Sequence, residues 1–394
     1  MKSVISYTLD RCVRCLSCLR VCPTGAIIKQ KDRVVIQHKN CINCGKCLNV
    51  CDTKGLQAKG STLHDLENYD YAIALVPSNI YGMCKDLNEV SDLYAGLLAI
   101  GFDEVVDLSD IEGTLINKAA LIATKSNEYR IYASCQSIRK WIELDYPMLR
   151  DKLLILEDAS EIMAKRLRKQ HHNKNLGIFL LCGCPSKLMD AKYPYGGKSN
   201  VDHALSVVDL FPKINAIKNK AHVDVKICKE GLYNSSSHLL KEYLVNSAMV
   251  IDGCENIAEV FELAEFNQLP DVKLLVPQFC NNGCIGGSLL WGNPYSSEMN
   301  IRNLVKYANK PCAKLDEDEY LKEYVITHKE TLTMKERIER YNRLNEIIEQ
   351  LPGFNCGACG YANCRKMAEE ILAGNRSLKD CKIANFNKED DYES

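Results

Sequence analysis

Short apolar, β-branched runs alternate with longer amphipathic stretches between about residues 70 and 325. The runs occupy residues 71–76, 104–108, 177–181, 223–227 and 249–251. Continuous apolar runs of this length are typical of strands buried on both faces, and strands separated by helices form parallel sheets. The middle of the chain is therefore predicted to fold as parallel α/β layers.

A helical pattern follows near the C-terminus. Residues 329–350 carry many charges, and apolar residues recur at helical spacing, namely Met334, Ile338, Tyr341, Leu344 and Ile347 or Ile348. This predicts one long amphipathic helix that ends before Pro352 and Gly353. A second helix is expected over 366–373, stopping at Gly374.

The charge balance excludes some classes of partner. The 394 residues include 50 Lys and Arg against 51 Asp and Glu, a formal net charge of −1. Such a chain has no basic field for a nucleic-acid backbone and no polybasic surface for anionic lipid. Residues 1–7 lack an apolar signal core, and no stretch approaches the roughly 20 apolar residues of a membrane-spanning helix. We expect a soluble, cytoplasmic protein with no nucleic-acid partner and no membrane insertion.

The 21 cysteines change the picture. An odd, clustered set in a chain too long to need disulfides indicates metal binding. Eight of them lie within residues 12–51 as two copies of one unit at an offset of 29 residues, pairing Cys12/Cys41, Cys15/Cys44, Cys18/Cys47 and Cys22/Cys51.

Each copy has the cysteine spacing of bacterial ferredoxins, in which three thiolates hold one cubane and the fourth reaches the other cluster. By that rule one [4Fe–4S] cluster has the ligands Cys12, Cys15, Cys18 and Cys51, and the other has Cys41, Cys44, Cys47 and Cys22. Zinc knuckles or buried thiols would need eight coincident spacings. Residues 1–60 are therefore predicted to form a ferredoxin-like α+β domain with two [4Fe–4S] clusters.

A second cysteine group lies at the other end of the chain, at Cys356, Cys359, Cys364 and Cys381. Glycines between the thiolates let backbone amides approach sulfur closely. The run from Leu351 resembles the small four-cysteine [4Fe–4S] domain of the B subunit of Rnf electron-transfer complexes and of corrinoid iron–sulfur proteins. We expect residues 351–394 to be a small helical domain with one [4Fe–4S] cluster, joined by a linker helix over 329–350. Zinc remains the alternative at this spacing.

Three cysteine-bearing segments lie in the middle of the chain, at 133–136, 182–187 and 279–287. Each follows a strand-like run, which places it at the carboxyl edge of a parallel sheet, where ligands bind. Any one of these cysteines could instead be a small buried hydrophobic residue.

In order and spacing, the three segments resemble the signature loops of the [FeFe]-hydrogenase large subunit. Val76-Pro77-Ser78, the run 101–106 and the run 141–147 also resemble that family. The resemblance covers roughly residues 70–310. It implies an α/β fold of two facing lobes around a buried metal site, here assigned to residues 61–328.

The resemblance also implies roles for individual residues. Cys135, Cys184, Cys280 and Cys284 would ligate the cubane of an H-cluster, with Cys284 bridging to a two-iron subsite. Lys187 would hydrogen-bond a cyanide of that subsite, a use suited to a compact ammonium group. Other residues would line the cofactor, namely Pro77, Ser78, Gln278, Gly286 and Gly287.

Several residues depart from the family pattern. Ser134 stands where catalytic members carry a proton-relaying cysteine, and a hydroxyl relays protons poorly. Further changes are Gln136, Cys182 and the run Val276-Pro277-Gln278, and Asn117 and Lys118 stand where family members use glutamates. Members with serine at position 134 are the atypical or sensory ones, and this chain shows no output domain of its own.

The sequence thus predicts an iron–sulfur, [FeFe]-hydrogenase-like oxidoreductase that oxidises H2 or reduces protons slowly, or senses H2. Its partners would be H2, protons and a separate redox or signalling protein. The alternative is a non-catalytic iron–sulfur protein with a lone [4Fe–4S] cluster in the central domain, which transfers electrons or clusters. A redox enzyme for a different substrate is a third possibility.

Other features are predicted to be structural. Packing is the expected role of the remaining cysteines, Cys84, Cys182, Cys228, Cys254 and Cys312. The run 196–199 ends like a phosphate-binding loop but lacks its first glycine, with Lys192 in that place. His171 and His172 are expected on a solvated face.

Overall fold

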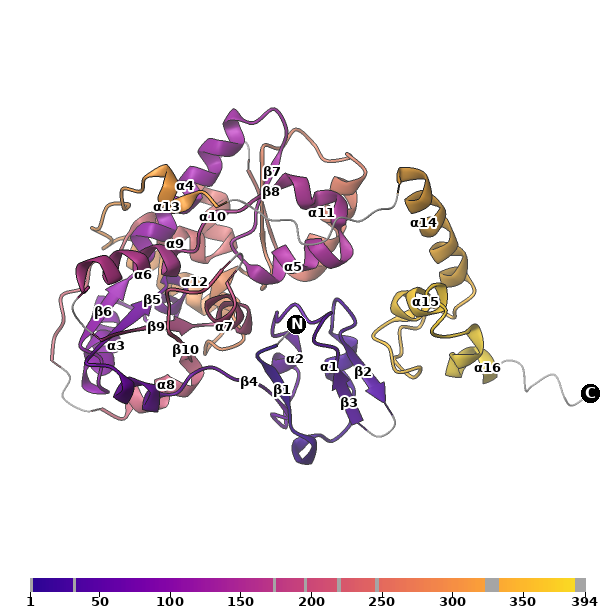
Figure 1. Cartoon of the computed structure of the whole chain (residues 1–394), viewed down its shortest axis with the longest axis horizontal. Helices are drawn as coiled ribbons and strands as arrows, with labels where there is room; N and C mark the ends of the chain where they lie inside the picture. The colour runs from indigo at the N-terminus through magenta and orange to yellow at the C-terminus, as the bar shows by residue number, and fades with distance from the viewer. Residues whose placement is uncertain are drawn as a thin grey trace, which may run out of the picture. The chain divides into compact units, whose positions relative to one another are not determined.

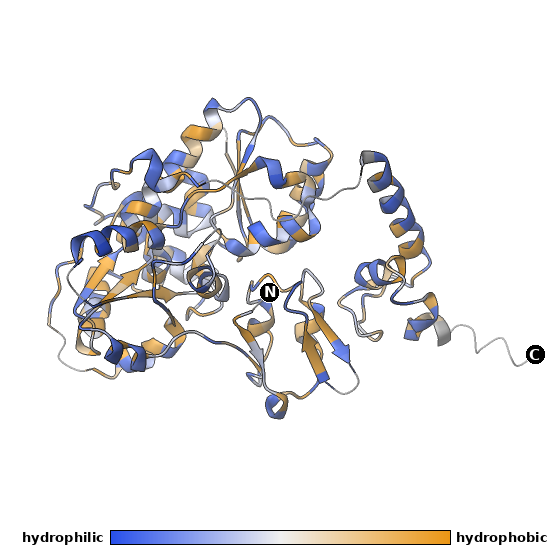
Figure 2. Ribbon diagram, viewed as in Figure 1, coloured by the Kyte–Doolittle hydropathy of each residue, from blue (hydrophilic) through white to orange (hydrophobic). Residues whose placement is uncertain are grey.

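The computed structural model describes residues 3–30, 33–172, 175–194, 197–217, 221–244, 248–322 and 333–386. The chain divides into two compact units (Figure 1). One unit consists of Met1–Cys41, Gly45–Gln57 and Ile326–Ser394, and the other of Ile42–Cys44 and Ala58–Val325. Hydrophobic residues concentrate in the strands, and hydrophilic residues lie mainly on the helices and connecting loops (Figure 2).

The larger unit contains two α/β lobes, each built on a four-stranded parallel sheet. In the first lobe the strand order is β10-β9-β5-β6. The strands are β5 (Tyr71–Val76), β6 (Glu104–Asp107), β9 (Leu176–Cys182) and β10 (His203–Ser206). Every residue of β9 is buried, as expected for a central strand of a parallel sheet.

The second lobe has the order β11-β12-β7-β8, and its strand pairs are also parallel. Its strands are β7 (Arg130–Tyr132), β8 (Leu153–Leu154), β11 (Ala248–Asp252) and β12 (Leu274–Gln278). Trp141 and Phe261 pack in its core. The prediction of an α/β fold with two lobes is confirmed.

Helices connect the strands of both lobes. The α-helices are α3 (Leu87–Ala99), α4 (Ser109–Lys125), α5 (Gln136–Asp145), α6 (Ala159–Gln170), α7 (Pro185–Lys192), α8 (Val207–Asn215), α9 (Lys229–Ser235), α10 (Ser237–Tyr243), α11 (Cys254–Glu265), α12 (Pro294–Val305) and α13 (Glu317–Tyr320). Short 3-10 turns are η2 (Leu63–Asn68), η3 (Ser78–Met83), η4 (Pro147–Lys152) and η5 (Cys284–Gly286).

The predicted strand over 223–227 is wrong, whereas the other four predicted runs form β5, β6, β9 and β11. Val225 and Ile227 are buried, but their segment joins neither sheet. The backbone N–H of Val223 donates to the Ser91 hydroxyl at 2.8 Å, and the Ile227 carbonyl accepts from Lys310 at 3.1 Å. The backbone of a buried apolar run can thus form its hydrogen bonds with a side chain or a loop instead of with a neighbouring strand. The periodicity of the sequence does not distinguish these two cases.

The smaller unit joins the two ends of the chain. Its N-terminal part has β1 (Ile5–Tyr7) paired with β4 (Leu56–Ala58), the antiparallel hairpin of β2 (Ile27–Gln30) and β3 (Arg33–Ile36), and the short helices η1 (Leu9–Arg11), α1 (Ser17–Arg20) and α2 (Lys46–Asn49). Its C-terminal part has α14 (Met334–Glu349), α15 (Cys364–Leu372), η6 (Leu378–Asp380) and α16 (Lys382–Phe386).

The two predicted C-terminal helices are present. A capping box between Thr333 and Glu336 begins α14, and residues 329–332 lie outside the described residues. Gly374, with φ +76°, follows the end of α15.

The C-terminal part packs on the β2–β3 hairpin. Ile28 of β2 shares a buried core with Leu344, Tyr361 and Met367. The backbone N–H of Lys29 donates to the Gly360 carbonyl at 3.1 Å.

Candidate metal centre

Three strand ends bring the central cysteines together. Cys135 follows β7 and caps α5, Cys184 lies between β9 and α7, and Cys280 follows β12. Cys284 begins η5 after a turn at Asn282 and Gly283, where φ is +62° and +84°. These loops therefore lie at the carboxyl ends of parallel strands, as the sequence predicted.

The thiols of this group interact electrostatically. Burial and the charge of Cys135 raise the pKa of Cys184 to about 11. Burial, with the charges of Cys184, Cys135 and Cys284, raises the pKa of Cys280 well above its usual value. Burial and the charges of Cys135 and Cys184 likewise raise the pKa of Cys284. Four thiolates whose charges oppose one another's ionisation need a cationic centre to stabilise them, and a metal cluster provides one.

The loop that carries Cys280 and Cys284 packs closely against the loop that carries Cys184. A Cβ atom on Gly287 would lie 2.3 Å from the Gly183 carbonyl oxygen, and the Leu289 N–H donates to that same oxygen at 2.9 Å. A Cβ atom on Gly286 would lie 2.3 Å from the Asn281 carbonyl oxygen. These two glycines are required by the close approach of neighbouring backbone.

The Cys135 sulfur lies beside one serine hydroxyl, that of Ser186, whereas the hydroxyl of the adjacent Ser134 has no such contact among the described residues. The Cys135 Sγ lies 3.5 Å from the Ser186 Oγ, which also accepts from the backbone N–H of Ser137 at 3.0 Å. The Ser134 side chain is partly exposed, and within the described ranges its hydroxyl makes no hydrogen bond. The structure therefore shows no proton path that begins at Ser134 among the described side chains.

Lys187 is held by a carboxylate that the sequence did not single out. Its ammonium forms an ion pair with Asp158, which also caps α6 by accepting from the Ser160 N–H at 2.9 Å. Although burial opposes it, the Lys187 charge lowers the pKa of Asp158 to about 2. The Lys187 ammonium can donate three hydrogen bonds, so the pair with Asp158 leaves donors for a further acceptor.

Glu112 is a second acidic residue that sequence reasoning missed. It lies in the first turn of α4 and accepts from the backbone N–H of Ser78 at 3.0 Å and from the Ser78 hydroxyl. Burial raises its pKa to about 7, although Ser78 and the charge of Lys187 oppose the change, while the charge of Asp107 adds to it. Ser78 is itself buried directly after Pro77 at the end of β5.

The remaining predicted residues of this region have structural contacts. The Gln278 side-chain amide donates to the Asn234 carbonyl at 2.8 Å, and its oxygen faces Gly283. The Lys118 ammonium lies 5.0 Å from the centre of the Tyr320 ring. Asn117 accepts from the Tyr243 hydroxyl at 2.7 Å.

The thiols of the N-terminal cysteines also interact electrostatically with one another. Burial and the charges of Cys12, Cys15 and Cys51 raise the pKa of Cys18 to about 11. Cys51, from the second copy of the repeat, thus lies near enough to Cys18 for its charge to act on that thiol.

The second N-terminal group behaves in the same way. Burial, with the charges of Cys22, Cys41 and Cys18, raises the pKa of Cys47. Cys44 belongs to the larger unit and packs at the edge of the core around Trp141.

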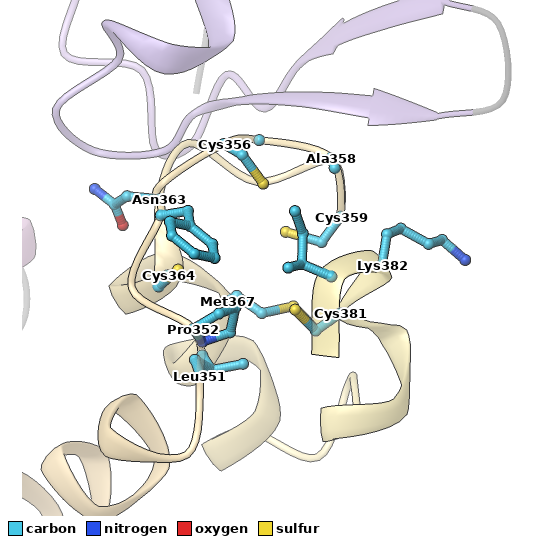
Figure 3. Close-up of a pocket in the computed structure, with 13 residues that line it drawn as sticks. Leu351, Pro352, Cys356, Ala358, Cys359, Asn363, Cys364, Met367, Cys381 and Lys382 are labelled. Atoms are coloured by element: carbon cyan, nitrogen blue, oxygen red, sulfur yellow. The ribbon is translucent and has the colours of Figure 1, made fainter. Parts of the chain in front are cut away.

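The C-terminal cysteines line one pocket, with Cys356, Cys359, Cys364 and Cys381 around it (Figure 3). Gly357 and Gly360 have φ of +73° and +93°, which favours glycine, and the Tyr361 N–H donates to the Cys359 sulfur. The predicted approach of backbone amides to sulfur is present in this loop.

Other motifs have structural roles. Cys84, Cys182 and Cys254 are buried. In the run 196–199, whose first residue lies outside the described residues, Ser199 donates to Glu161. The His171 ring stacks on Tyr71 at 5.2 Å and is only half-exposed, whereas His172 is exposed.

Two family models match the ends of the chain. A 4Fe–4S dicluster domain matches residues 4–52, and the FeS family, which describes an Fe–S cluster, matches residues 351–383. An uncharacterised protein of Methanocaldococcus jannaschii is 55% identical over 38 residues, 10% of this chain and 17% of that protein. The match therefore spans less than a fifth of this curated relative. Both ends of the chain carry iron–sulfur domains.

Solved structures of [FeFe]-hydrogenases align with about two thirds of this chain. A variant of HydA1 from Chlamydomonas reinhardtii aligns with a TM-score of 0.48 and 12% identity over 67% of this chain and 97% of that one. An apo variant of the same protein gives 0.45 and 12% over 67% and 96%. A hydrogenase studied for oxygen inactivation gives 0.46 and 12% over 67% and 97%.

No helix in the described ranges is both long and apolar enough to cross a membrane.

Proposed function

We propose that this chain is an [FeFe]-hydrogenase-like protein that oxidises H2 or reduces protons slowly, or senses H2. The observation that supports this most is the convergence of Cys135, Cys184, Cys280 and Cys284 from three strand ends in two lobes. The proposal also rests on the resemblance of their loops to the hydrogenase signature loops.

The residues around these cysteines fit an H-cluster. Cys284, which begins η5 in the third cysteine loop, would be the ligand shared with the two-iron subsite. The charge of Lys187 lowers the pKa of Cys284, and the charge of Glu112 raises it. An ammonium group and a carboxyl group therefore lie near Cys284. When bound, the H-cluster would supply the metal chemistry that splits H2 heterolytically.

The chain's own residues would hold the cofactor and handle protons. Lys187, oriented by Asp158, would donate a hydrogen bond to a cyanide, and Ser78 and Pro77 would line the same side. Gly286 and Gly287 would keep the third loop close to the second. Glu112, whose pKa of about 7 suits proton exchange near neutral pH, would hold a proton at Oε2.

Electrons would pass through cubane clusters outside the central site. We assign two [4Fe–4S] clusters to residues 1–60, one to residues 351–394, and the H-cluster to residues 61–328, with 329–350 as a linker helix. The hydrogen bond from Lys29 to Gly360 and the core around Ile28 support an electron path between the two terminal cluster domains. A separate redox or signalling protein would then be the electron partner.

One observation favours a second candidate function. The Ser134 hydroxyl has no hydrogen-bond partner among the described residues, so the family's usual proton relay has no replacement at that position. The alternative is an electron-transfer or cluster-carrying protein with a lone [4Fe–4S] cluster on the four central cysteines.

Isotope exchange between H2 and D2O tests the proposal, because it detects turnover even when electrons leave slowly. Protein produced with the hydrogenase maturases should form HD and D2, and Cys284→Ala should abolish this. The matched control, Cys84→Ala, changes a buried cysteine of the first-lobe core and should retain the exchange. Absence of exchange in matured wild-type protein with complete clusters would favour the electron-transfer function.

A further inference from the structure

A cysteine pair and a carboxylate meet in the larger unit, in a group to which the function above assigns no role. The Cys228 Sγ lies 3.7 Å from the Cys312 Sγ and 3.2 Å from the Glu230 Oε2. The three ligand atoms all lie within 4.8 Å of one another, and the described part of the chain has no second such group. Two cysteines expected to serve packing, 84 residues apart in the sequence, thus form one cluster of donor atoms.

The spacing suits a single tetrahedral ion. Two thiolates at about 2.3 Å from zinc in tetrahedral geometry lie about 3.8 Å apart. The observed 3.7 Å is close to this value. A cubane holds its thiolates at different iron atoms and so further apart, which separates this group from the iron–sulfur ligands.

The donor set selects the class of metal. Two sulfur ligands disfavour magnesium and calcium, which prefer oxygen ligands. Two thiolates with one carboxylate suit a borderline divalent cation such as Zn²⁺.

Neighbouring groups orient the two sulfurs. The Asn117 side-chain amide donates to the Cys312 Sγ at 3.8 Å and accepts from the Tyr243 hydroxyl at 2.7 Å. The backbone N–H of Gly231 donates to Cys228. Outer hydrogen bonds of this kind fix the orientation of metal ligands. They also give Asn117 a role, at a position where the sequence suggested only a lost glutamate.

Gly113 of helix α4 leaves room for the two cysteines and the carboxylate. A Cβ atom on Gly113 would lie 2.7 Å from the Glu230 Cβ and 3.2 Å from the Cys312 Sγ. The absence of a side chain at this position therefore lets the carboxylate and the thiol approach each other. Cys228 is buried, whereas Cys312 and Glu230 are partly exposed, so an ion has a route from solvent.

We propose that Cys228, Glu230 and Cys312 bind one Zn²⁺ ion, with a fourth position open to water. Binding would release the two thiol protons, so that the ion meets two thiolates and one carboxylate. The bound ion would join the segment before α9 to the segment after α12. The site is independent of whether the central cysteines hold an H-cluster.

The test uses the full chain with its iron–sulfur clusters intact, exposed anaerobically to ZnCl2 and then dialysed. Elemental analysis should find one zinc per chain at unchanged iron content. Zinc-edge X-ray absorption should show two sulfur ligands near 2.3 Å with oxygen ligands completing the shell. Cys228→Ala and Cys312→Ala should remove this zinc, whereas Cys84→Ala should retain it.

A conservative variant guards against loss of folding. Glu230→Gln keeps the side-chain shape and should weaken zinc binding at least tenfold while the iron content stays the same. Three results would overturn the proposal: no retained zinc, zinc with four sulfur ligands that marks an unfilled cluster site, or a Cys228–Cys312 disulfide in the anaerobic protein.

Discussion

Ser78 donates to one oxygen of Glu112 twice, from its hydroxyl and, at 3.0 Å, from its backbone N–H. Ser78 follows the first strand of one lobe, and Glu112 lies in the first turn of the helix after the next strand. The pair places a carboxyl group with a pKa of about 7 beside the segment that we assign to the cofactor.

Glu112→Gln should therefore change the pH dependence of turnover. Wild-type H2 oxidation with a redox dye should show an inflection near pH 7, where Glu112 changes protonation state. The variant should lose that inflection and at least tenfold in kcat, because a positioned acid–base group contributes 10²–10⁴-fold. Glu89→Gln, at the start of α3, is the control and should behave as wild type. An identical pH profile in Glu112→Gln would contradict the proton-holding role.

Ser134→Cys should raise turnover if the H-cluster is present. A thiol with a pKa of about 8.5 exchanges protons near neutral pH far more readily than a hydroxyl. Because the Ser134 hydroxyl has no partner within the described ranges, Ser134→Ala should leave the rate unchanged. Equal or lower turnover in Ser134→Cys, with unaltered cluster spectra, would count against a relay at this position.

Lys187→Met should destabilise the fold as well as the cofactor site. It would leave Asp158 buried without its counter-charge, which costs about 3 kcal/mol of unfolding free energy at pH 7. The folded pKa of Asp158 is about 2, below its usual 3.8, so the pair stabilises the protein above pH 3.8 and this stabilisation is lost as the pH falls through about 2.

Urea unfolding under anaerobic conditions measures this effect. The deficit of Lys187→Met should shrink from pH 7 to pH 4, since Asp158 becomes protonated once its partner is removed. Lys187→Met combined with Asp158→Asn should recover part of the lost stability. Equal stability of the single and double variants would show that the pair is not coupled.

Gly287→Ala should damage the central site selectively. Its Cβ atom would lie 2.3 Å from the Gly183 carbonyl, so the second and third cysteine loops would have to separate. We expect iron to fall to about twelve atoms per chain, the content of three cubanes. Gly197→Ala is the matched control, because no atom lies within 4 Å of its Cβ position. Full iron in Gly287→Ala would show that the loops tolerate separation.

Cys381→Ala should remove only the C-terminal cluster. Iron should fall by about four atoms per chain, and the electron paramagnetic resonance signal of one reduced cubane should disappear. Zinc in place of iron at this site in the wild-type protein would decide for the zinc alternative.

The sequence predicted the parts of the fold that depend on local patterns. The apolar runs before Cys184 and Cys280 correctly placed both residues at strand ends, and the repeat spacing predicted an association of Cys51 with Cys18, whose pKa the charge of Cys51 raises. Repeat spacing and strand periodicity carry this information without any knowledge of long-range contacts.

Long-range polar contacts could not be predicted in this way. Glu112 is a single acidic residue in the first turn of a helix, a position where acids are common for electrostatic reasons alone. Only the folded chain brings it to Ser78, or brings Asp158 to Lys187 and Cys312 to Cys228. The run 223–227 was wrongly predicted as a strand because its apolar residues have the pattern of a buried strand. Its backbone contacts, which depend on the fold, are with other segments.

An infrared spectrum of anaerobically purified protein, produced with the hydrogenase maturases, tests the hydrogenase proposal most directly. The account predicts bands in the region where metal-bound carbonyl and cyanide absorb, and these bands should change under H2. A blank spectrum from protein with four intact cubanes, under conditions that mature a control hydrogenase, would contradict it.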